Sequence, residues 1–173
     1  IIDAKSGVTG AGRGLNLPNL FCECTETMKA YKIATHRHTS EIEQELSLLA
    51  GEDIMVSFTP HLAPMKRGIL ATCYANLTEK KTTEEIVELY REFYKNEEFV
   101  RVYPAGELPE VKHIAGSNYV GIGAVVDERL NRAVIVSCID NLVKGAAGQA
   151  VQNMNLLFGL AENVGLTDAG LYL

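Results

Sequence analysis

The stretch Asp140-Asn-Leu-Val-Lys-Gly-Ala-Ala-Gly-Gln-Ala-Val-Gln-Asn-Met-Asn-Leu-Leu157 is the most informative part of this chain. It opens with polar and glycine-rich residues and continues as a helix, because Val151, Met154 and Leu157 or Phe158 recur at helical spacing. The Gly-Ala-Ala-Gly sequence near its start lets another backbone or a ligand approach closely, since no side chain there exceeds a methyl group. We therefore expect a buried helix over about residues 141–160.

The composition is that of one globular domain. The chain has 173 residues, of which 47% are hydrophobic, so it can bury a core of its own. A formal net charge of -6 and the lack of a lysine or arginine run argue against nucleic acid or an anionic membrane surface as a partner. No apolar stretch approaches the roughly 18 to 20 residues of a membrane span.

The four cysteines indicate a reducing environment rather than a disulfide framework. Cys73 and Cys138 lie in apolar strand patterns and are expected to be small buried hydrophobic residues. Cys22 and Cys24 are too close for a low-strain disulfide, and no second pair accompanies them as a zinc site would need. We therefore predict no metal site and a cytoplasmic location.

Several short segments have the apolar content or the alternation of β-strands, with polar or glycine-rich turns between them. These are residues 1–4, 31–34, 54–62, 69–77, 99–103, 119–126 and 133–139. Together with inserted helices and a final long helix, they predict an α+β fold with a mostly antiparallel or mixed sheet and helices on one face. We expect a single domain over residues 1–173.

Capping residues indicate two further helices. Ser40 and Glu43 have the spacing of a capping box, and the helix they begin should end near Gly51. Its apolar face consists of Ile42, Leu46 and Leu49. Thr82 or Thr83 should cap the next helix, whose first turn is acidic and so suits the helix dipole. Its buried stripe consists of Ile86, Leu89, Tyr90 and Phe93.

The hairpin of residues 120–126 and 133–139 is apolar along both strands. A sheet of this size has one face to cover with helices and a second face that must also be removed from water. That second face either meets a partner subunit or is covered by another segment of the same chain, and the sequence favours neither.

His36 and His38 flank Arg37 just before the first of these helices. If the segment is extended, alternation places both imidazoles on one side and Arg37 on the other. The positive end of the helix would lower the pKa of a nearby histidine, which suits a base that must be neutral near pH 7. Two ordinary surface histidines would have the same pattern.

A glycine-rich loop, Lys5-Ser-Gly-Val-Thr-Gly-Ala-Gly-Arg13, follows the first strand. Its backbone amides, together with Ser6 and Arg13, are suited to receive a phosphate or a carboxylate. The loop is not a P-loop, because no Gly-Lys-Ser/Thr sequence ends it. A tight turn without a ligand would also explain the glycines.

Asn141 can both donate to and accept from the carboxamide of a nicotinamide ring, although Asp140 and Asn141 would serve equally well as a helix-capping pair. Lys144 is suited either to a phosphate or to solvent. Arg67 precedes Gly68 and an apolar strand. It would either hold an acyl phosphate in the pocket or lie in an ordinary loop.

Five segments, in order along the chain, resemble the family of N-acetyl-gamma-glutamyl-phosphate reductases. They are Asp3–Arg13, His36-Arg-His-Thr-Ser-Glu-Ile-Glu-Gln44, Phe58-Thr-Pro-His-Leu-Ala-Pro-Met-Lys-Arg-Gly68, Gly116-Ser-Asn118 and the stretch from Asp140. Aspartate-semialdehyde dehydrogenases have a looser version of the last pattern, and the motifs at His36 and Phe58 argue against them. The resemblance implies the fold of the glyceraldehyde-3-phosphate dehydrogenase-like C-terminal domain.

The resemblance also implies NADPH-dependent reduction of N-acetyl-gamma-glutamyl phosphate to N-acetylglutamate semialdehyde and phosphate, in arginine biosynthesis, through a cysteine thioester. The cysteine and the dinucleotide-binding domain are expected outside this chain, which would be the second half of the enzyme and inactive alone. The final helix would pack on that domain, and the enzyme would be a homo-oligomer, either a dimer or a tetramer. An aspartyl-phosphate enzyme and a non-catalytic assembly domain are the alternatives.

Individual roles follow from the same resemblance. His36 would be the catalytic base beside the cysteine. Contacts to the acyl-phosphate substrate would come from Ser6, Arg13, Tyr31, His38 and Glu41. Contacts to the cofactor NADP(H) would come from Gly7, Asn141, Lys144 and Gly145.

Overall fold

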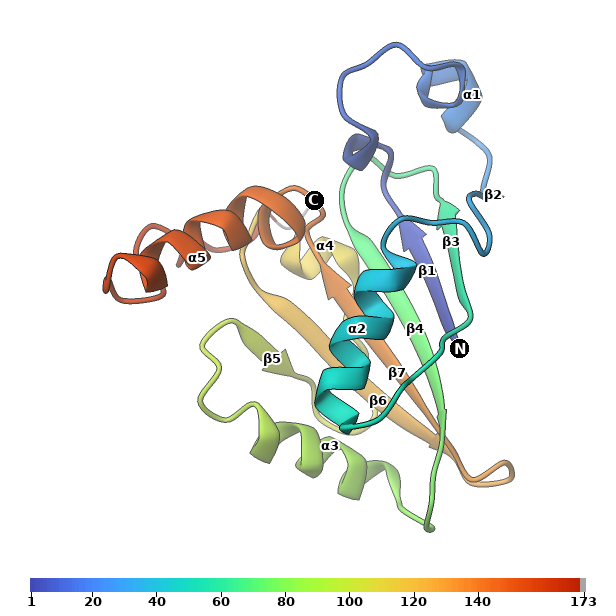
Figure 1. Ribbon diagram of the computed structural model, residues 1–173, viewed down its shortest axis with the longest axis vertical. Helices are drawn as coiled ribbons and strands as arrows, with labels where there is room; N and C mark the ends of the chain where they lie inside the picture. The colour runs from blue at the N-terminus through green and yellow to red at the C-terminus, as the bar shows by residue number, and fades with distance from the viewer. Residues whose placement is uncertain (172–173) are drawn as a thin grey trace.

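The computed structural model describes residues 1–171 and is built on a seven-stranded sheet with the strand order β2-β3-β1-β4-β7-β6-β5 (Figure 1). The strands are β1 (Ile2–Ser6), β2 (Lys29–Ala30), β3 (Phe58–Leu62), β4 (Ile69–Asn76), β5 (Val100–Val102), β6 (Val120–Asp127) and β7 (Arg132–Ile139). The pairs β1–β3 and β5–β6 are parallel, and all other neighbours are antiparallel. The predicted α+β fold with a mostly antiparallel, mixed sheet is confirmed.

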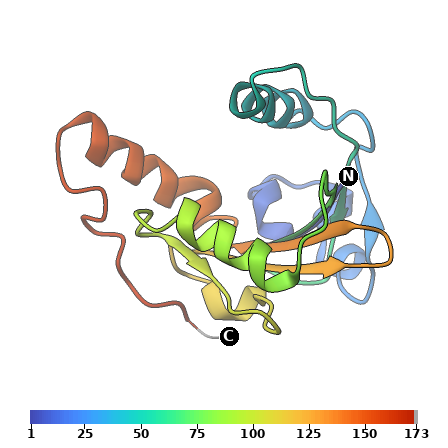
Figure 2. The ribbon, with the colours of Figure 1, turned by 90° about the horizontal axis from the view of Figure 1, so that it is seen from below.

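Helices and short helical turns connect the strands. They are η1 (Val8–Ala11), η2 (Leu17–Asn19), α1 (Phe21–Cys24), α2 (Thr39–Ala50), α3 (Thr83–Phe93), α4 (Val111–Ile114), the π-helical turn η3 (Val143–Ala147) and α5 (Gly148–Leu157). The longer helices α2 and α3 lie on one side of the sheet, and the single turn of α4 lies on the other (Figure 2). Among residues 1–171, no helix is long and apolar enough to cross a membrane.

The core lies between α3 and the β6–β7 hairpin. Ile86 and Val87 of α3 are buried against Ala124 and Val126 of β6. Thr82 caps α3 as predicted, because its hydroxyl accepts from the amide of Glu85 while the Glu85 carboxylate accepts from the amide of Thr82. The predicted stripe was partly wrong, since Val87 takes part in the core and both Leu89 and Phe93 are exposed.

The opposite face of the sheet is covered only in part. Gly121 and Gly123 alternate with core residues and so face away from α3. A Cβ on Gly123 would lie 2.9 Å from both Leu108 and Pro109, so the segment before α4 packs directly on the strand. Farther along β6, Val125 pairs with Val134 and is 41% exposed. One part of this face is therefore covered by the segment before α4, and another part is apolar and uncovered.

The segment before α2 corrects two predictions. Residues 31–34 are not a strand: β2 ends at Ala30, and a turn follows in which Lys32 and Ala34 have positive φ. No capping box forms at Ser40, because the Glu43 carboxylate accepts instead from the amide of Val56 at 3.1 Å. That hydrogen bond ties α2 to the chain leading into β3. The helix ends at Gly51 as predicted, in the left-handed conformation.

The apolar faces of α2 and α5 are not buried as expected. Leu49 of α2 is exposed, and so are Met154, Leu157 and Phe158 at the end of α5. The buried face of α5 is formed by Gly148, Gln152 and Asn155. Polar contacts hold this face in place, since the side-chain Nδ2 of Asn155 donates to the carbonyls of Glu162 and Val164, both at 3.0 Å. The prediction of a helix from the apolar spacing is confirmed for α5, but the prediction that its apolar side is buried is wrong.

Candidate active site

Three loops meet at one end of the central strands of the sheet, because β1, β3 and β7 end there and β4 begins there. Ser6 pairs with Leu62 on one side and with Ile69 on the other, and Ile69 pairs with Ile139. The chain segments that follow or precede these residues are therefore brought together. They are η1, the loop of residues 63–68, and the turn from Asp140 into η3.

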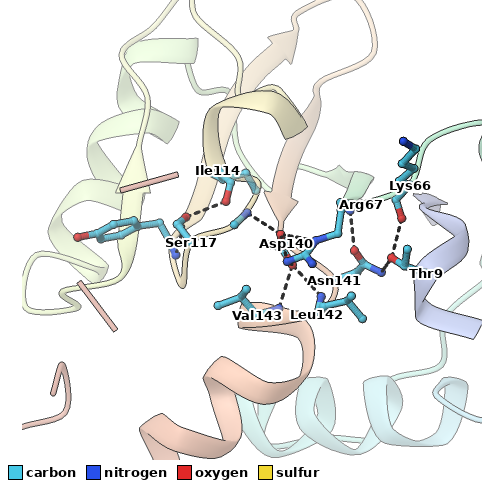
Figure 3. A network of polar contacts seen from close by, with 12 residues as sticks. Thr9, Lys66, Arg67, Ile114, Ser117, Asp140, Asn141, Leu142 and Val143 are labelled. Atoms are coloured by element: carbon cyan, nitrogen blue, oxygen red, sulfur yellow. Dashed lines mark hydrogen bonds and ion pairs between the residues drawn. The ribbon is translucent and has the colours of Figure 1, made fainter. Parts of the chain in front are cut away.

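Asp140 is the centre of this junction, as Figure 3 shows. Its buried carboxylate accepts from the amides of Gly116 at 2.6 Å, Leu142 at 2.8 Å and Val143 at 2.9 Å, and from the guanidinium of Arg67. Burial alone would raise the pKa of Asp140, but these hydrogen bonds outweigh it and hold the pKa below its ordinary value. Asp140 thus caps the last helix, and Arg67 pairs with it rather than lying free in a loop or pocket.

Asn141 continues the same network. Its Oδ1 accepts from the amide of Gly68 at 2.6 Å, and its Nδ2 donates to the hydroxyl of Thr9 at 3.0 Å (Figure 3). The Thr9 hydroxyl in turn donates to the carbonyl of Lys66 at 2.6 Å. Asn141 is 6% exposed, and the main role of its side chain in the fold is to join η1 to the loop before β4. A nicotinamide contact would use the remaining lone pair of Oδ1 or the second N–H of Nδ2.

The glycine-rich loop is not an open cradle for an anion. The amides of Gly7, Val8 and Thr9 donate to carbonyls of residues 65–68, and the Ser6 hydroxyl donates to the carbonyl of Gly7. Gly7 is required by close approach, because a Cβ there would lie 2.8 Å from the carbonyl oxygen of Lys66. Arg13 is exposed and makes no hydrogen bond or ion pair with another residue of the described part of the chain.

Lys144 points into the domain. Its ammonium donates to Oε1 of Gln152 at 2.6 Å and lies 5.3 Å from the ring centroid of Phe99. Burial lowers the pKa of Lys144, although Glu162 and Glu97 act against that shift. The next residue, Gly145, is exposed, and its amide donates to the carbonyl of Asp140 at 2.9 Å within the π-helical turn. The Lys144 side chain therefore lies against α5, whereas the backbone of Gly145 is exposed.

Gly148 does not offer its backbone to a ligand, contrary to expectation. It is buried, and a Cβ there would lie 2.4 Å from Oδ1 of Asn118 and 2.7 Å from a methyl group of Val143. Asn118, from the Gly116-Ser-Asn118 motif, is 1% exposed and donates from Nδ2 to Gln152 at 3.0 Å. The glycine is needed so that this asparagine can pack on the helix.

A second group of residues surrounds His36, on the loop between β2 and α2. The ring of His36 meets the rings of Tyr31, Phe58 and His38 edge to face, with centroids 5.7, 5.4 and 4.9 Å away. The segment is a turn and not an extended strand, so alternation is not the reason that the two imidazoles are close. His38 and Glu41 line a hollow together with Ile42, Glu45 and Leu46 of α2.

The surroundings of His36 favour its neutral form. Partial burial lowers the pKa of His36, and the positive charges of His38, Lys32 and Arg37 lower it further. The Tyr31 hydroxyl stays protonated, because burial raises its pKa. Within residues 1–171, no group of three or more His, Cys, Asp or Glu side chains is placed to hold a metal ion, and all four cysteines are free.

The model of the semialdehyde dehydrogenase dimerisation domain matches residues 1–141 of the 173. The chain belongs to the semialdehyde dehydrogenase family. The matched region of this semialdehyde dehydrogenase domain contains the sheet, the His36 group and Asn141, whereas η3 and α5 follow it.

Curated relatives agree in their description. The N-acetyl-gamma-glutamyl-phosphate reductase of Acetivibrio thermocellus is 68% identical over 173 residues, which are 100% of this chain and 50% of that protein. The protein of the same name from Symbiobacterium thermophilum is 65% identical over 171 residues, which are 98% of this chain and 49% of that protein. The semialdehyde dehydrogenase domain described here spans about half the length of the curated relatives it matches.

Solved structures share the fold at much lower identity. Aspartate semialdehyde dehydrogenase II from Vibrio cholerae has a TM-score of 0.67 at 16% identity, over 91% of this chain and 54% of that one. A probable aspartate-semialdehyde dehydrogenase from Pseudomonas aeruginosa has a TM-score of 0.67 at 17% identity, with the same coverage. The predicted fold of a glyceraldehyde-3-phosphate dehydrogenase-like C-terminal domain is confirmed.

The predicted site residues of this semialdehyde dehydrogenase domain fall into two groups. Tyr31, His36, His38 and Glu41 gather at the start of α2, and Ser6, Gly7, Asn141, Lys144 and Gly145 lie at or beside the Asp140 junction. Arg13 belongs to neither. Sequence reasoning gave no role to Thr9 or Phe58, although both lie in the quoted motifs. A further hollow, beside the end of α3 and β5, contains none of the predicted residues.

Proposed function

We propose that the full-length protein containing this chain is an NADPH-dependent N-acetyl-gamma-glutamyl-phosphate reductase. It would convert the acyl phosphate to N-acetylglutamate semialdehyde and phosphate, in the cytoplasm, as a step of arginine biosynthesis. The observation that carries this proposal is the 68% identity over all 173 residues to a protein of that name. The solved aspartate semialdehyde dehydrogenases support the fold alone.

The two groups of residues suit different parts of this reaction. When bound, the nicotinamide cofactor would supply the hydride. Asn141 and Gly145 fit it best, because Gly145 is exposed and without a side chain, while the Asn141 amide retains one lone pair and one N–H. Lys144 and Gly7 fit it less well, since one is turned inward and the other is buried against Lys66.

The His36 group would receive the acyl end of the substrate, beside a cysteine supplied from outside this chain. A histidine that is neutral near pH 7 can serve as an acid or base next to a thiol. The rings of Tyr31, Phe58 and His38 hold the His36 ring in one orientation. Tyr31 and His38 contact the His36 ring, and Glu41 lines a hollow with His38, which supports a role for the three in contacting the rest of the substrate.

The same domain would mediate homo-oligomerisation through the uncovered part of the sheet. Val125 pairs with Val134, and Val134 pairs with Tyr74, so these side chains form one apolar area facing away from α3. Val125→Asp should lower the mass of the full-length protein in size-exclusion chromatography with light scattering. Leu89→Asp, an exposed apolar position on α3, is the control. Equal masses for both variants and wild type would argue against this interface.

The activity is tested by running the full-length enzyme in reverse. With N-acetylglutamate semialdehyde and inorganic phosphate, we expect reduction of NADP⁺, followed by absorbance of the reduced nicotinamide. The signal should vanish without phosphate, because the thioester must be released as an acyl phosphate. Reduction that proceeds equally without phosphate would contradict the proposed reaction.

A further inference from the structure

The side-chain amide of Asn141 is held by the chain at both its oxygen and its nitrogen. Oδ1 accepts from the main-chain amide of Gly68 at 2.6 Å, and Nδ2 donates to the hydroxyl of Thr9 at 3.0 Å (Figure 3). The Thr9 hydroxyl donates its own hydrogen to the carbonyl of Lys66 at 2.6 Å, so toward Asn141 it can only accept. These two contacts fix the plane of the amide and decide which of its ends is oxygen and which is nitrogen.

The same amide keeps one donor and one acceptor that the fold does not use. An asparagine amide has two N–H groups and two lone pairs on its oxygen, and residues 1–171 use one of each. Asn141 is 6% exposed, and a buried polar group is normally fully hydrogen-bonded. The two unused groups therefore favour a ligand with the complementary pair. The carboxamide of nicotinamide has that pair, since its oxygen accepts and its NH₂ group donates.

Gly10, the residue after Thr9 in η1, leaves the approach to Nδ2 of Asn141 open. Gly10 is exposed and its φ is not positive, so the backbone conformation does not require a glycine there. A Cβ at this position would lie 3.4 Å from Nδ2 of Asn141 and would meet no other segment of residues 1–171 within 4 Å. Alanine is the better residue at a helical position. The missing side chain thus matters for what reaches the amide and not for the fold.

We propose that η1 presents the Asn141 amide to the nicotinamide carboxamide, with Thr9 as a positioning residue that holds the amide and Gly10 as the position that leaves its nitrogen uncovered. Oδ1 of Asn141 accepts from the carboxamide NH₂ group, and the free N–H of Nδ2 donates to the carboxamide oxygen. A cofactor that lacks the NH₂ group is rejected, because the Oδ1 lone pair then stays unpaired. This inference rests on the proposed reductase function, and it gives roles to two residues, Thr9 and Gly10, that the proposed function does not use.

Binding of two cofactors to the full-length protein tests the contact without turnover. NADP⁺ carries the carboxamide, whereas its acetylpyridine analogue has a methyl group in place of the NH₂ group. In isothermal titration calorimetry, wild type should bind NADP⁺ about 10-fold more tightly than the analogue, the factor expected for one hydrogen bond to an otherwise unpaired group. Thr9→Val should reduce this preference to about 3-fold or less, and Thr9→Ser, which keeps the hydroxyl, should retain it. Equal preference in wild type and Thr9→Val would overturn the positioning role, and no preference in wild type would overturn the contact itself.

Gly10→Ala tests the open approach to Nδ2. The added methyl group would cover the amide nitrogen, so the Kd for NADP⁺ should rise by about 5-fold or more, while the melting temperature of the free protein should not fall. Gly14→Ala is the matched control, because its Cβ would lie 3.6 Å from Nδ2 of the exposed Asn16. An unchanged Kd in Gly10→Ala would overturn the role of Gly10.

Steady-state kinetics separates positioning from general damage and from failure of the proposed function. In Thr9→Val the KM for NADP⁺ should rise by about 10-fold, whereas the KM for N-acetylglutamate semialdehyde should stay at its wild-type value. A rise in both would overturn the positioning role. Thr25→Val also removes a hydroxyl that donates to a carbonyl, at 2.7 Å, and should change neither KM. A wild type that binds NADP⁺ with the expected preference, but does not reduce it with the semialdehyde and phosphate, would overturn the reductase function and still support the carboxamide contact.

Discussion

Asp140 and Arg67 form a bidentate pair in which Nε of Arg67 lies 3.0 Å from Oδ2 and Nη2 lies 2.9 Å from Oδ1 of the carboxylate. The Asp140 side chain is fully buried, whereas that of Arg67 is 30% exposed. Because Asn141 follows directly, this pair positions the amide that joins η1 to the loop before β4. One buried carboxylate therefore connects the loops at the strand ends, beside the candidate cofactor site.

Asp140→Asn should strongly destabilise the protein. The substitution keeps the shape of the side chain but removes the charge that Arg67 and three backbone amides approach. We expect the free energy of unfolding to fall by about 2–4 kcal/mol, as when one partner of a buried ion pair is removed. Urea denaturation of the full-length protein measures this. Glu88→Gln, which removes an exposed pair with Arg91, is the control and should have a much smaller effect.

The contribution of Asp140 should depend on pH with a definite sign. Its pKa in the folded state is lowered, so the stabilisation is fully present above the unfolded pKa and is lost as pH falls through the folded pKa. The stabilities of wild type and Asp140→Asn should thus differ most above about pH 5 and converge below about pH 4. Urea denaturation across this range checks it. A difference that stays constant on acidification would be inconsistent with a depressed pKa.

Gly148→Ala should destabilise the last helix although alanine is the better helix former. The new methyl group would lie 2.4 Å from Oδ1 of Asn118 and 2.7 Å from Val143. We expect the free energy of unfolding, measured by thermal denaturation, to drop by about 1–3 kcal/mol, which is the usual cost of overpacking. Gly14→Ala is the matched control, because its nearest neighbour would be the Asn16 side chain at 3.6 Å. If both variants melt like wild type, the packing at Gly148 has been misjudged.

Much of the sheet and of α3 could be predicted from local sequence. The apolar runs at residues 119–126 and 133–139 became β6 and β7, and Thr82 caps α3 as predicted, with Glu85 completing a capping box that was not predicted. These signals involve residues close in the chain, whose preferences agree with the final packing. The turn after β2 was missed because Tyr31 and Ile33 have strand-forming side chains, whereas hydrogen bonding of the backbone there produces a turn.

Helical periodicity could not decide which side of a helix is buried. In α5 the apolar residues Leu157 and Phe158 are exposed, while Gln152 and Asn155 are buried because they find hydrogen-bond partners. Lys144 lies 8 residues from Gln152, and Glu162 lies 7 residues from Asn155, so these partners fall outside the three- and four-residue spacing that helical periodicity describes. We interpret the exposed apolar face as the surface expected to contact the dinucleotide-binding domain. The capping box at Ser40 failed for a similar reason, since Glu43 bonds to Val56.

The candidate site was predictable as a list of residues but not as a geometry. The motifs identified His36, His38 and Asn141, and the structure shows the contacts each one makes. Sequence could not foresee that the amide of His38 would donate to Nδ1 of His36, because that depends on the turn. It also could not show that Lys144 turns inward, since a lysine at a helix start has room for either direction.

Lys144→Met tests that inward orientation. Since the ammonium contacts Gln152 and Phe99, its loss should lower stability but leave the KM for NADPH close to wild type. A lysine that binds a phosphate would behave differently, because losing a charged hydrogen bond would raise KM by about 10-fold or more. Steady-state kinetics of the full-length enzyme distinguishes the two, with Lys80→Met as the surface control. A large rise in KM for Lys144→Met alone would restore the phosphate contact.

We propose that this chain is the second half of a reductase for the acetylated substrate. The most direct test compares kcat/KM of one preparation of the full-length enzyme for N-acetylglutamate semialdehyde and for aspartate semialdehyde, with phosphate and NADP⁺ saturating. We expect the acetylated substrate to be preferred by at least about 100-fold, since a site built to hydrogen-bond a specific polar group can discriminate by about 10,000-fold or more. Preference for aspartate semialdehyde would place the enzyme with the solved structures that share its fold and contradict this account.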